Sequence, residues 1–583
     1  IPKISETEMI ALQSGGTFID RDILKGNINY PKKPNLKNKF DRTKLNSILD
    51  NFDSKKIYPN NSNIIYELAN NKFFSFLINE EYGGIKLSVN ELSEILTKIT
   101  SVDPALGVVV MVPNSLGPGE LITLYGTENQ KNNYLPKLAN GEMIPCFGLT
   151  GPNNGSDATG QIDKGYVFEE NGKVKIKVKL NKRYITLAPV ANLMGIAFDL
   201  EDPNNLLNKS GITVALVERN HSNLIQNTYH NPLDVGFPNG TIKGDIVIDL
   251  EQIIGGKENI GNGWKMLMEC LAAGRAVSLP ATANASSKVA TYGIYNYINV
   301  RDQFKLKLSN MEAIQEKFNN MVYNTWLIQS SVEMTNDILD SGHSPSVISA
   351  IMKQQTTERG RIVLNEGMDI HAGAGICVGY GNFLEKYYKS APIGITVEGS
   401  NTLTRSLIIF AQGLNKSHPY IFPILESILD NDINKFKENF NNIVKLIIGL
   451  YFKTLNNNKS FEQQIIDFAL LTNFVALKGG KLKQEQMLSG TMADIFGNLY
   501  LGISVKYCDN YSMVSSKLTK YVLKKIMIEN QEKINKVIDN LDNEKYLLLH
   551  LKRNIKPITF EEERLIFKEI SKNKKIMSKI SKN

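Results

Sequence analysis

The hydrophobic pattern of this chain changes its period twice, and the order of the changes restricts the folds that it can adopt. Over residues 44–140, apolar residues recur at helical spacing. Over 145–254 the period becomes two, with strict alternation at 173–180. From residue 263 onwards helical spacing returns. Because strands and helices do not alternate along the chain, the pattern does not predict a Rossmann domain.

The chain has 583 residues, which is too many for a single hydrophobic core. We therefore predict a multidomain α+β fold with four parts along the sequence. They are an N-terminal helical domain (1–143), a central β domain (144–262), a helical bundle (263–418) and an additional C-terminal helical domain (419–583).

Charge and cysteine content exclude several classes of protein. The net charge of +8 is spread along the chain and lacks the basic cluster with interleaved aromatics of a nucleic-acid-binding surface, so we predict no nucleic-acid partner. The four cysteines stand far apart, which favours buried thiols in a reducing compartment over disulfides or a zinc site. The six histidines lack the spacing of metal ligands, and we predict no metal.

No apolar run reaches the roughly 18 to 20 residues that a membrane span needs. We therefore expect a cytoplasmic protein. Two alternatives stay open at this point. One is peripheral attachment to the inner membrane, with the Lys-rich C-terminal end contacting anionic lipid. The other is an anchoring or targeting segment ahead of Ile1.

Two neighbouring motifs suit a planar cofactor. A loop of Gly, Asn, Ser and Asp follows a short apolar strand, and in it Thr150, Ser156 and free backbone N–H groups can bond a polar ring or a phosphate. Further on, Tyr184 and Thr186 place an aromatic ring beside a hydroxyl in a strand. Taken singly, an elaborate turn and a half-buried strand aromatic are the commoner interpretations.

Two arginines and a glycine pair follow in the later helices. Arg275 and Arg301 could each pair with a phosphate through the planar guanidinium, although a solvated surface charge is commoner for a single arginine. Gly373 and Gly375 follow Asp369 and resemble part of a dinucleotide-binding motif. That motif is rejected, because the preceding residues look helical and the next glycine comes one place too late.

One carboxylate, Glu398, stands in an apolar run directly before Gly399. Burial disfavours the charged form of a carboxyl, which raises its pKa and makes it a stronger base. Gly399 would let a substrate approach closely. The alternative is an acid in the first turn of a helix, where glutamate is frequent.

In this order and at these separations, the motifs resemble those of the acyl-CoA dehydrogenase family, most closely its long bacterial subgroup of fatty-acid β-oxidation. The likeness covers about residues 74–420, and more weakly the C-terminal region. It implies a helical domain, a β domain and a four-helix domain, with FAD between the last two and a neighbouring subunit.

The resemblance also implies roles for individual residues. The residues that would contact FAD are Thr150, Ser156, Tyr184, Thr186, Arg301, Phe304, Asp369, Gly373 and Gly375. Those that would contact the substrate are Ser156, Arg275 and Gly399. The family usually has Trp in place of Tyr184, Gln in place of Asp369, and two adjacent glycines in place of Ala372-Gly373.

Glu398 matches the catalytic base of the family. Some members carry the base at the residue before Arg275, but here that residue is Gly274, which has no side chain. The implied activity is FAD-dependent conversion of medium- or long-chain fatty acyl-CoA to trans-2-enoyl-CoA, the first step of β-oxidation. A homodimer and an electron-transfer flavoprotein, or similar acceptor, are the implied partners. Two alternatives remain, an acyl-CoA oxidase that uses oxygen and a catalytically silent CoA-binding scaffold.

Overall fold

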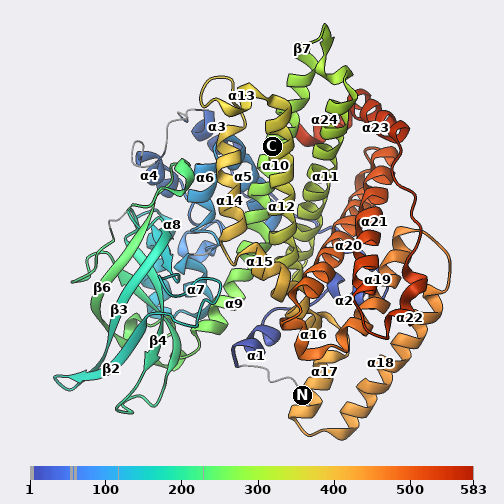
Figure 1. The fold of residues 1–583 in the computed structure, drawn as a ribbon. Coiled ribbons are helices and arrows are strands. Elements are labelled where there is room, and N and C mark those ends of the chain that lie inside the picture. Colours follow the sequence, from blue (N-terminus) through green and yellow to red (C-terminus); the bar gives the residue numbers. More distant parts are fainter. Residues whose placement is uncertain are drawn as a thin grey trace. The chain divides into compact units, whose positions relative to one another are not determined.

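The computed structural model describes residues 6–50, 52, 57, 62–115, 117–226 and 229–581. The chain divides into two compact units (Figure 1). The first unit comprises Ile1–Pro34, Ala283–Thr396 and Ser400–Asn583, and the second comprises Asn35–Thr282 and Val397–Gly399. The three residues around Glu398 thus belong to a different unit from the chain on either side of them.

In the second unit, helices precede and follow a mixed β-sheet. The helices are α3 (Arg42–Asp50), α4 (Asn63–Asn70), α5 (Val89–Val102), α6 (Pro104–Met111), α7 (Pro118–Tyr125), α8 (Glu128–Ala139) and α9 (Gly263–Ala273). A π-helical turn, Gly274–Ser278, follows α9. The periodic apolar residues Leu92, Ile95, Leu96 and Ile99 form the buried face of α5, as their spacing predicts.

The sheet lies in the central part of the sequence, where the period of two was found. Its strands are β1 (Pro145–Gly148), β2 (Lys164–Glu170), β3 (Lys173–Thr186), β4 (Leu193–Glu201), β5 (Gly211–Glu218) and β6 (Asn239–Asp249). The strand order is β1-β4-β2-β3-β6, with β5 paired to β4. β1 and β2 run parallel to β4, and the other pairs are antiparallel. Leu121 of α7, Leu135 of α8 and Met266 of α9 share one apolar core with β1, β4 and β5.

The first unit is almost entirely helical. Its helices are α1 (Glu6–Gln13), α2 (Ile19–Leu24), most of α10 (Leu279–Val300), α11 (Glu312–Asp340), α12 (Ser346–His371), α13 (Gly373–Ile376), α14 (Glu385–Thr396), α15 (Asn401–Leu403), α16 (Gly413–Ser417), α17 (Ile421–Leu429), α18 (Ile433–Thr454), α19 (Phe461–Ala476), α20 (Gln486–Ser512), α21 (Ser516–Asp539), α22 (Lys545–Leu548), α23 (Phe560–Lys572) and α24 (Lys574–Ser581). Between α10 and α11 the short strands β7 (Asp302–Gln303) and β8 (Leu306–Lys307) form a hairpin. Between α15 and α16, Thr404–Gln412 is a π-helix.

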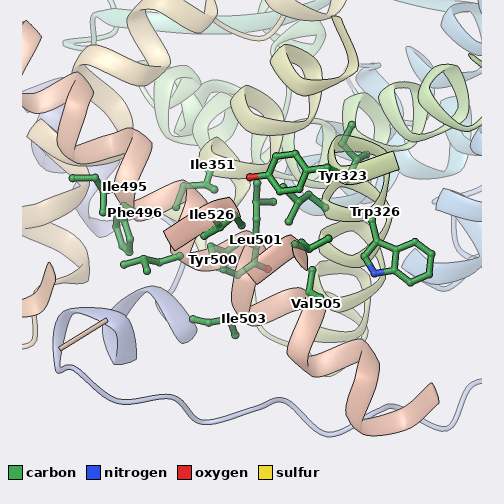
Figure 2. Close-up of a cluster of buried hydrophobic side chains, with 14 of the residues drawn as sticks. Tyr323, Trp326, Ile351, Ile495, Phe496, Tyr500, Leu501, Ile503, Val505 and Ile526 are labelled. Atoms are coloured by element: carbon green, nitrogen blue, oxygen red, sulfur yellow. The ribbon is translucent and has the colours of Figure 1, made fainter. Parts of the chain in front are cut away.

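One hydrophobic core joins the helical bundle of the first unit to the C-terminal helices. Tyr323 and Trp326 of α11 and Ile351 of α12 lie in the same buried cluster as Tyr500 of α20 and Ile526 of α21 (Figure 2). The prediction of an additional helical region at the C-terminus is confirmed. Its helices complete the core of the bundle, because the apolar faces of α11 and α12 are covered by α20 and α21.

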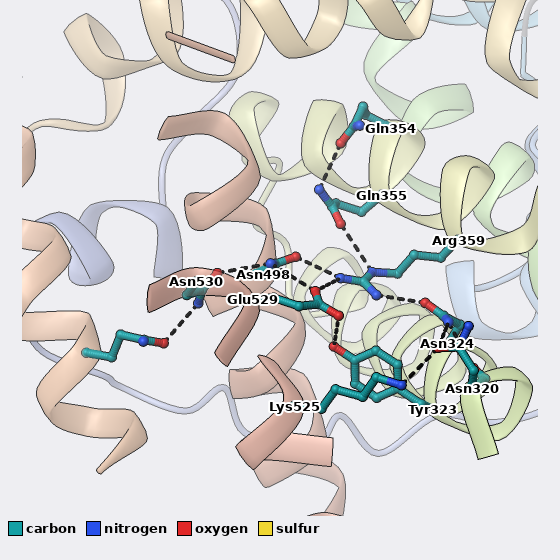
Figure 3. Close-up of polar contacts among 11 residues, drawn as sticks. Asn320, Tyr323, Asn324, Gln354, Gln355, Arg359, Asn498, Lys525, Glu529 and Asn530 are labelled. Atoms are coloured by element: carbon teal, nitrogen blue, oxygen red, sulfur yellow. Dashed lines mark hydrogen bonds and ion pairs between the residues drawn. The ribbon is translucent and has the colours of Figure 1, made fainter. Parts of the chain in front are cut away.

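A buried polar network crosses the same helices (Figure 3). The guanidinium of Arg359 on α12 donates to Asn324 Oδ1 at 2.7 Å, Asn498 Oδ1 at 2.8 Å and Glu529 Oε2 at 3.2 Å. The Tyr323 hydroxyl donates to the other oxygen of Glu529 at 2.9 Å. A buried arginine is tolerated because these acceptors replace the water that it loses.

Other predicted properties can be compared directly with the described residues. Cys146, Cys270 and Cys508 are buried free thiols, whereas Cys377 is exposed, so the expectation of buried thiols was wrong for that residue. It lies just after α13, in a surface turn. Within the described ranges, no helix is long and apolar enough to cross a bilayer, and no group of three or more His, Cys, Asp or Glu side chains could hold a metal ion.

Candidate active site

Glu398 lies in a tight turn between α14 and α15. Its φ angle is 57° and that of Gly399 is 94°, both in the left-handed region. Glycine adopts such angles freely, whereas a residue with a side chain loses roughly 1–2 kcal/mol there. Non-glycine residues are kept in this conformation mainly where the surrounding structure requires it, often at functional sites. The turn ends at Ser400, whose hydroxyl accepts from the N–H of Leu403, the last residue of α15.

Two residues of the π-helical turn after α9 determine the position of Glu398: Arg275 bonds its backbone, and Gly274 leaves space for its carboxylate. Arg275 Nε donates to the backbone oxygen of Glu398 at 2.9 Å. A Cβ atom on Gly274 would lie only 2.4 Å from Glu398 Oε1 and 2.6 Å from Oε2. The carboxylate therefore occupies the space that a side chain at position 274 would need. Burial lowers the pKa of the Arg275 guanidinium, and the charge of Glu398 opposes that shift.

The loop that contains Thr150 is shaped by a residue that the sequence did not single out. Asn154 is buried, and its Oδ1 accepts from the Gly151 N–H at 2.7 Å while its Nδ2 donates to the Leu149 and Ala158 carbonyls at 3.1 and 2.9 Å. The Thr150 carbonyl accepts from the backbone N–H of the residue before Tyr184, at 3.0 Å. Ser156 lies exposed further along the loop.

A second residue missed from the sequence is Lys182, whose side chain is fully buried. Its Nζ lies 3.1 Å from Asp163 Oδ2 and donates to the Leu149 carbonyl at 3.1 Å. Burial lowers the pKa of Lys182, and Asp163 opposes the shift. A signal was present, because Ile176, Val178, Leu180 and Lys182 occupy the inward positions of the alternating strand. A lysine in that register needs an anionic or carbonyl partner.

Tyr184 stands at a bulge where the register of β3 against β6 shifts. Its φ of 60° turns the ring off the sheet, and 57% of the side chain is exposed. The Arg183 guanidinium lies over the ring at 4.9 Å, and the His230 ring meets it edge-on at 5.1 Å. The strand therefore presents an aromatic surface with an adjacent cation.

Thr186 continues this strand and joins it to β6. Asn239 Nδ2 donates to Thr186 Oγ1 at 3.3 Å and to the Tyr184 carbonyl at 3.2 Å. Asn239 Oδ1 and Thr241 Oγ1 are buried and have no hydrogen-bond partner among the described residues. Asn239 bonds the Tyr184 carbonyl, so its unsatisfied oxygen belongs to the same part of the sheet as the exposed ring, and the two would suit a planar cofactor with hydrogen-bonding edges, such as the isoalloxazine of FAD.

In the first unit, Arg301 and Phe304 lie on the hairpin after α10 (Figure 1). The Arg301 side chain is exposed, and its backbone N–H donates to the Tyr297 carbonyl at 2.9 Å. Phe304 lies at the tip of the hairpin with a φ of 52° and is 89% exposed. An aromatic side chain in that position is available to another molecule.

Asp369, Gly373 and Gly375 lie at the C-terminal end of α12 and in α13. The Asp369 carboxylate forms an ion pair with Lys317 Nζ at 2.6 Å. Gly373 is exposed and Gly375 is buried. Ala372 between the two helices has φ 53° and ψ −134°, a conformation that favours glycine. This strain explains why a glycine is usual at that position in the family that the sequence resembles.

The predicted site residues therefore form local groups within each unit. Arg275, Glu398 and Gly399 come together in the second unit, and Thr150, Tyr184 and Thr186 are joined through β3. In the first unit, the Tyr297 ring contacts the ring of His371 at 4.7 Å while its carbonyl binds Arg301. The hairpin and the α12–α13 glycines thus lie at the same end of that unit.

A restrained carboxylate, and a separate strand with an exposed aromatic ring next to an unsatisfied amide oxygen, suit a cofactor-dependent oxidoreductase. Three family models match the chain: the acyl-CoA dehydrogenase N-terminal domain over residues 37–142, the C-terminal domain over 261–412, and the bacterial-type C-terminal domain over 456–564. Together they cover more than half of the sequence. The chain belongs to the acyl-CoA dehydrogenase family, whose members are FAD-dependent oxidoreductases.

Individual relatives agree with this assignment. A 3-(aryl)acrylate reductase from Clostridium sporogenes is 25% identical over 378 residues, which cover 63% of this chain and 94% of the reductase. A very long-chain specific acyl-CoA dehydrogenase from Macaca fascicularis is 28% identical over 58% of this chain, but the match spans only 51% of that enzyme. The fold is similar to that of an acyl-CoA dehydrogenase from Bacillus anthracis, with a TM-score of 0.71, 19% identity, and coverage of 99% of this chain and 96% of the other.

Proposed function

We propose that the protein oxidises medium- or long-chain fatty acyl-CoA to trans-2-enoyl-CoA with FAD, as the first step of fatty-acid β-oxidation, and that Glu398 is the base. The observation that carries the proposal is the position of the Glu398 carboxylate over Gly274, with its backbone held by Arg275. No side chain at 274 competes for the role, and the strained turn fixes where the carboxylate points.

Each group of residues has a distinct task in this reaction. Glu398 removes the proton from the carbon next to the thioester, and Arg275 keeps the Glu398 backbone in place while that proton is transferred. The chemistry that bound FAD would supply is that of a two-electron acceptor for the hydride from the β-carbon. Tyr184 and Thr186 would lie against the flavin, and Thr150 and Ser156 in the neighbouring loop would contact flavin and acyl-CoA. Arg301 would neutralise pyrophosphate charge through its exposed guanidinium.

The flavin spectrum tests the proposal directly. Addition of palmitoyl-CoA without oxygen should bleach the visible flavin band of the FAD-loaded protein, and a series of acyl-CoA lengths then gives the preferred chain. Slow reoxidation in air and rapid reoxidation by an electron-transfer flavoprotein would support a dehydrogenase. Rapid peroxide formation in air would instead identify an oxidase. A flavin that no acyl-CoA reduces would contradict the proposal and favour a silent scaffold.

We further propose that the protein is a homodimer in which the β7–β8 hairpin and the turn after α13 contact the partner. Phe304, Ile376, Val378 and Tyr380 are strongly exposed on these two segments, which lie at one end of the first unit. Large apolar side chains gathered at one place mark an interaction surface more often than isolated ones do. A second copy would cover them and bring its own FAD close to Arg301.

We also propose peripheral attachment to an anionic membrane, through α18 instead of the C-terminal lysines. In α24 the apolar residues Ile576 and Ile580 are buried and Lys579 pairs with Glu333. By contrast, one face of α18 leaves its apolar residues in solvent, and Ile433 and Phe452 near its two ends are each 68% exposed.

The composition of α18 favours lipid as the occupant of this face. The exposed apolar residues are Ile433, Phe440, Val444, Ile448 and Phe452, while Leu450 on the other face packs into the core. The helix carries four lysines and one glutamate. A helix with an apolar stripe and basic flanks lies in the interface of an anionic bilayer, where both features are satisfied.

The attachment is tested by flotation with vesicles of phosphatidylcholine that contain phosphatidylglycerol. Changing Phe440, Ile448 and Phe452 together to serine should lower the bound fraction by about tenfold or more, because burying one such side chain contributes about 1.5–3 kcal/mol. The control changes Leu547, Phe560 and Leu565, which are equally apolar and exposed on other helices.

The control should float like the wild type, and all three proteins should sediment at the mass of a dimer. Equal flotation of the two variants would contradict the role of α18, and a monomer mass would contradict the homodimer.

A further inference from the structure

The turn that carries Glu398 begins and ends beside one buried side chain, that of Lys353 on α12. Lys353 is fully shielded from solvent. Its Nζ donates to Asn401 Oδ1 at 2.7 Å and to the backbone oxygen of Ile395 at 3.3 Å. Ile395 lies in the last turn of α14, and Asn401 is the first residue of α15. One nitrogen therefore bonds the chain just before the Glu398 turn and just after it.

The chemistry of these two partners explains why a lysine stands here. The last four carbonyls of a helix have no partner within the helix, and that of Ile395 is one of them in α14. The amide oxygen of Asn401 also accepts hydrogen bonds. A bridge between two acceptors needs a group that donates twice, and the lysine Nζ carries three donors and no acceptor. Lysine side chains also cap the C-terminal ends of other helices in this way.

Asn401 is bound to α12 at two further points. Its Nδ2 donates to Thr357 Oγ1 at 2.9 Å and to Glu358 Oε1 at 2.8 Å. Lys353 and Thr357 are four positions apart and share a face of α12. The buried amide of Asn401 thus has its oxygen and its nitrogen paired by the same long helix, which fixes the start of α15 on that helix.

This arrangement closes the Glu398 turn. Five residues separate Ile395 from Asn401, and stretched out they could span about 16 Å or more. Both ends are instead bonded to the same atom, so the backbone between them has to reverse its direction tightly. The left-handed φ angles of Glu398 and Gly399 lie within this reversal. The chain also leaves the first unit after Thr396 and returns to it at Ser400, next to the two residues that Lys353 bonds.

We propose that Lys353 is a positioning residue for the reaction, because it closes the turn in which Glu398 presents its carboxylate. The proposal rests on the proposed function of Glu398. Lys353 acts through the backbone on either side of the base. A base that is displaced by about 1 Å loses about a hundredfold in rate. Opening the turn should therefore slow proton transfer and leave the affinity for acyl-CoA nearly unchanged.

Three variants of the full FAD-loaded chain test the proposal. Lys353→Met fills a similar space but has no hydrogen-bond donor. Asn401→Leu keeps the lysine and removes one of its acceptors, so the test does not depend on one variant folding. Lys416→Met is the matched control. Lys416 is another buried lysine of the first unit, and its Nζ donates to the carbonyls of Leu12 and Ser14, which lie outside α14 and α15.

Amide hydrogen exchange measures the turn at rest, without substrate. The N–H groups of Leu403 and Thr404 donate to Ser400, to its hydroxyl at 3.3 Å and to its carbonyl at 2.9 Å. Peptides that cover residues 394–404 should exchange about tenfold faster in Lys353→Met and in Asn401→Leu, as expected when a buried side-chain hydrogen bond is lost. The same peptides of Lys416→Met should exchange at the wild-type rate.

Anaerobic stopped-flow reduction of the flavin by palmitoyl-CoA gives the functional measurement. Lys353→Met should lower the limiting rate at saturating substrate by about 10- to 100-fold and change the half-saturating concentration by less than about twofold. The limiting rate is expressed per bound flavin, so a loss of folded protein alone does not change it. Lys416→Met should keep the wild-type limiting rate.

The double variant separates one shared contact from two independent effects. Lys353→Met combined with Asn401→Leu should be slower than Lys353→Met alone by no more than about twofold, because both changes remove the same contact. If the two losses multiply instead, the residues act independently and the proposal is wrong.

Wild-type exchange of the turn in both Lys353→Met and Asn401→Leu would overturn the proposal, and so would equal loosening of the turn in Lys416→Met. A loosened turn with an unchanged limiting rate would overturn it as well. If acyl-CoA fails to reduce the wild-type flavin, the proposed function of Glu398 is wrong, and hydrogen exchange still decides whether Lys353 closes the turn.

Discussion

Replacing Glu398 by glutamine should lower the rate of flavin reduction by acyl-CoA by about 100- to 10,000-fold, the range that a positioned general base contributes. Glutamine has nearly the same shape but cannot accept the α-proton at neutral pH. The contact between Arg275 and the backbone at position 398 does not depend on the side chain, so the turn should persist. FAD content and acyl-CoA affinity should therefore stay close to those of the wild type, as measured by absorbance and by calorimetry.

Two further variants make this result specific. Gly274→Ala keeps the carboxylate but adds a methyl group where Glu398 Oε1 lies, so it should displace the base and reduce the rate while leaving the fold intact. Glu385→Gln removes an acid that pairs with Lys389 in the first turn of α14 and should change the rate by less than about twofold. Flavin reduction by Glu398→Gln at the wild-type rate would remove Glu398 from the mechanism.

Replacing Arg359 by alanine should have the largest effect on stability, about 3 kcal/mol. Arg359 is buried, and its loss leaves Glu529, Asn324 and Asn498 without their shared donor. Breaking a buried ion pair by removing one partner costs about 3–5 kcal/mol, and the lower end applies because the Glu529 side chain is 30% exposed. The urea midpoint of the helical signal should fall by about 1 M or more.

Arg361 provides the matched control on the same helix. It forms an exposed pair with Glu358 one turn away, and such pairs contribute about 0–1 kcal/mol. The urea midpoint of Arg361→Ala should therefore lie within a few tenths of a molar of the wild-type midpoint. If Arg359→Ala and Arg361→Ala have the same urea midpoint, the network in Figure 3 does not stabilise the packing of α20 and α21 on the bundle.

Much of the secondary structure follows from the period of the apolar residues. The alternation at 173–180 corresponds to β3, and the helical spacing around Leu92 corresponds to α5. The pairing of strands could not be predicted in the same way. β1 pairs in parallel with β4, although the β2–β3 hairpin lies between them in sequence, and a period of two gives no information about a partner so far along the chain.

The residues taken alone did not decide the role of any site residue. Glu398 stood out as an acid before glycine in an apolar run, but an acid in the first turn of a helix was an open alternative, and the resemblance to the family assigned it the role of base. Lys182 could have been found from its inward register in β3. The ion pair of Asp369 with Lys317 could not be predicted, because it joins residues of two different helices.

The positive φ of Glu398 sets function against stability at a single position. Glycine, and to a lesser extent asparagine, would relieve the backbone cost of roughly 1–2 kcal/mol, yet neither can accept the substrate proton. A glutamate in this turn therefore carries a backbone cost that only the proposed proton transfer would offset.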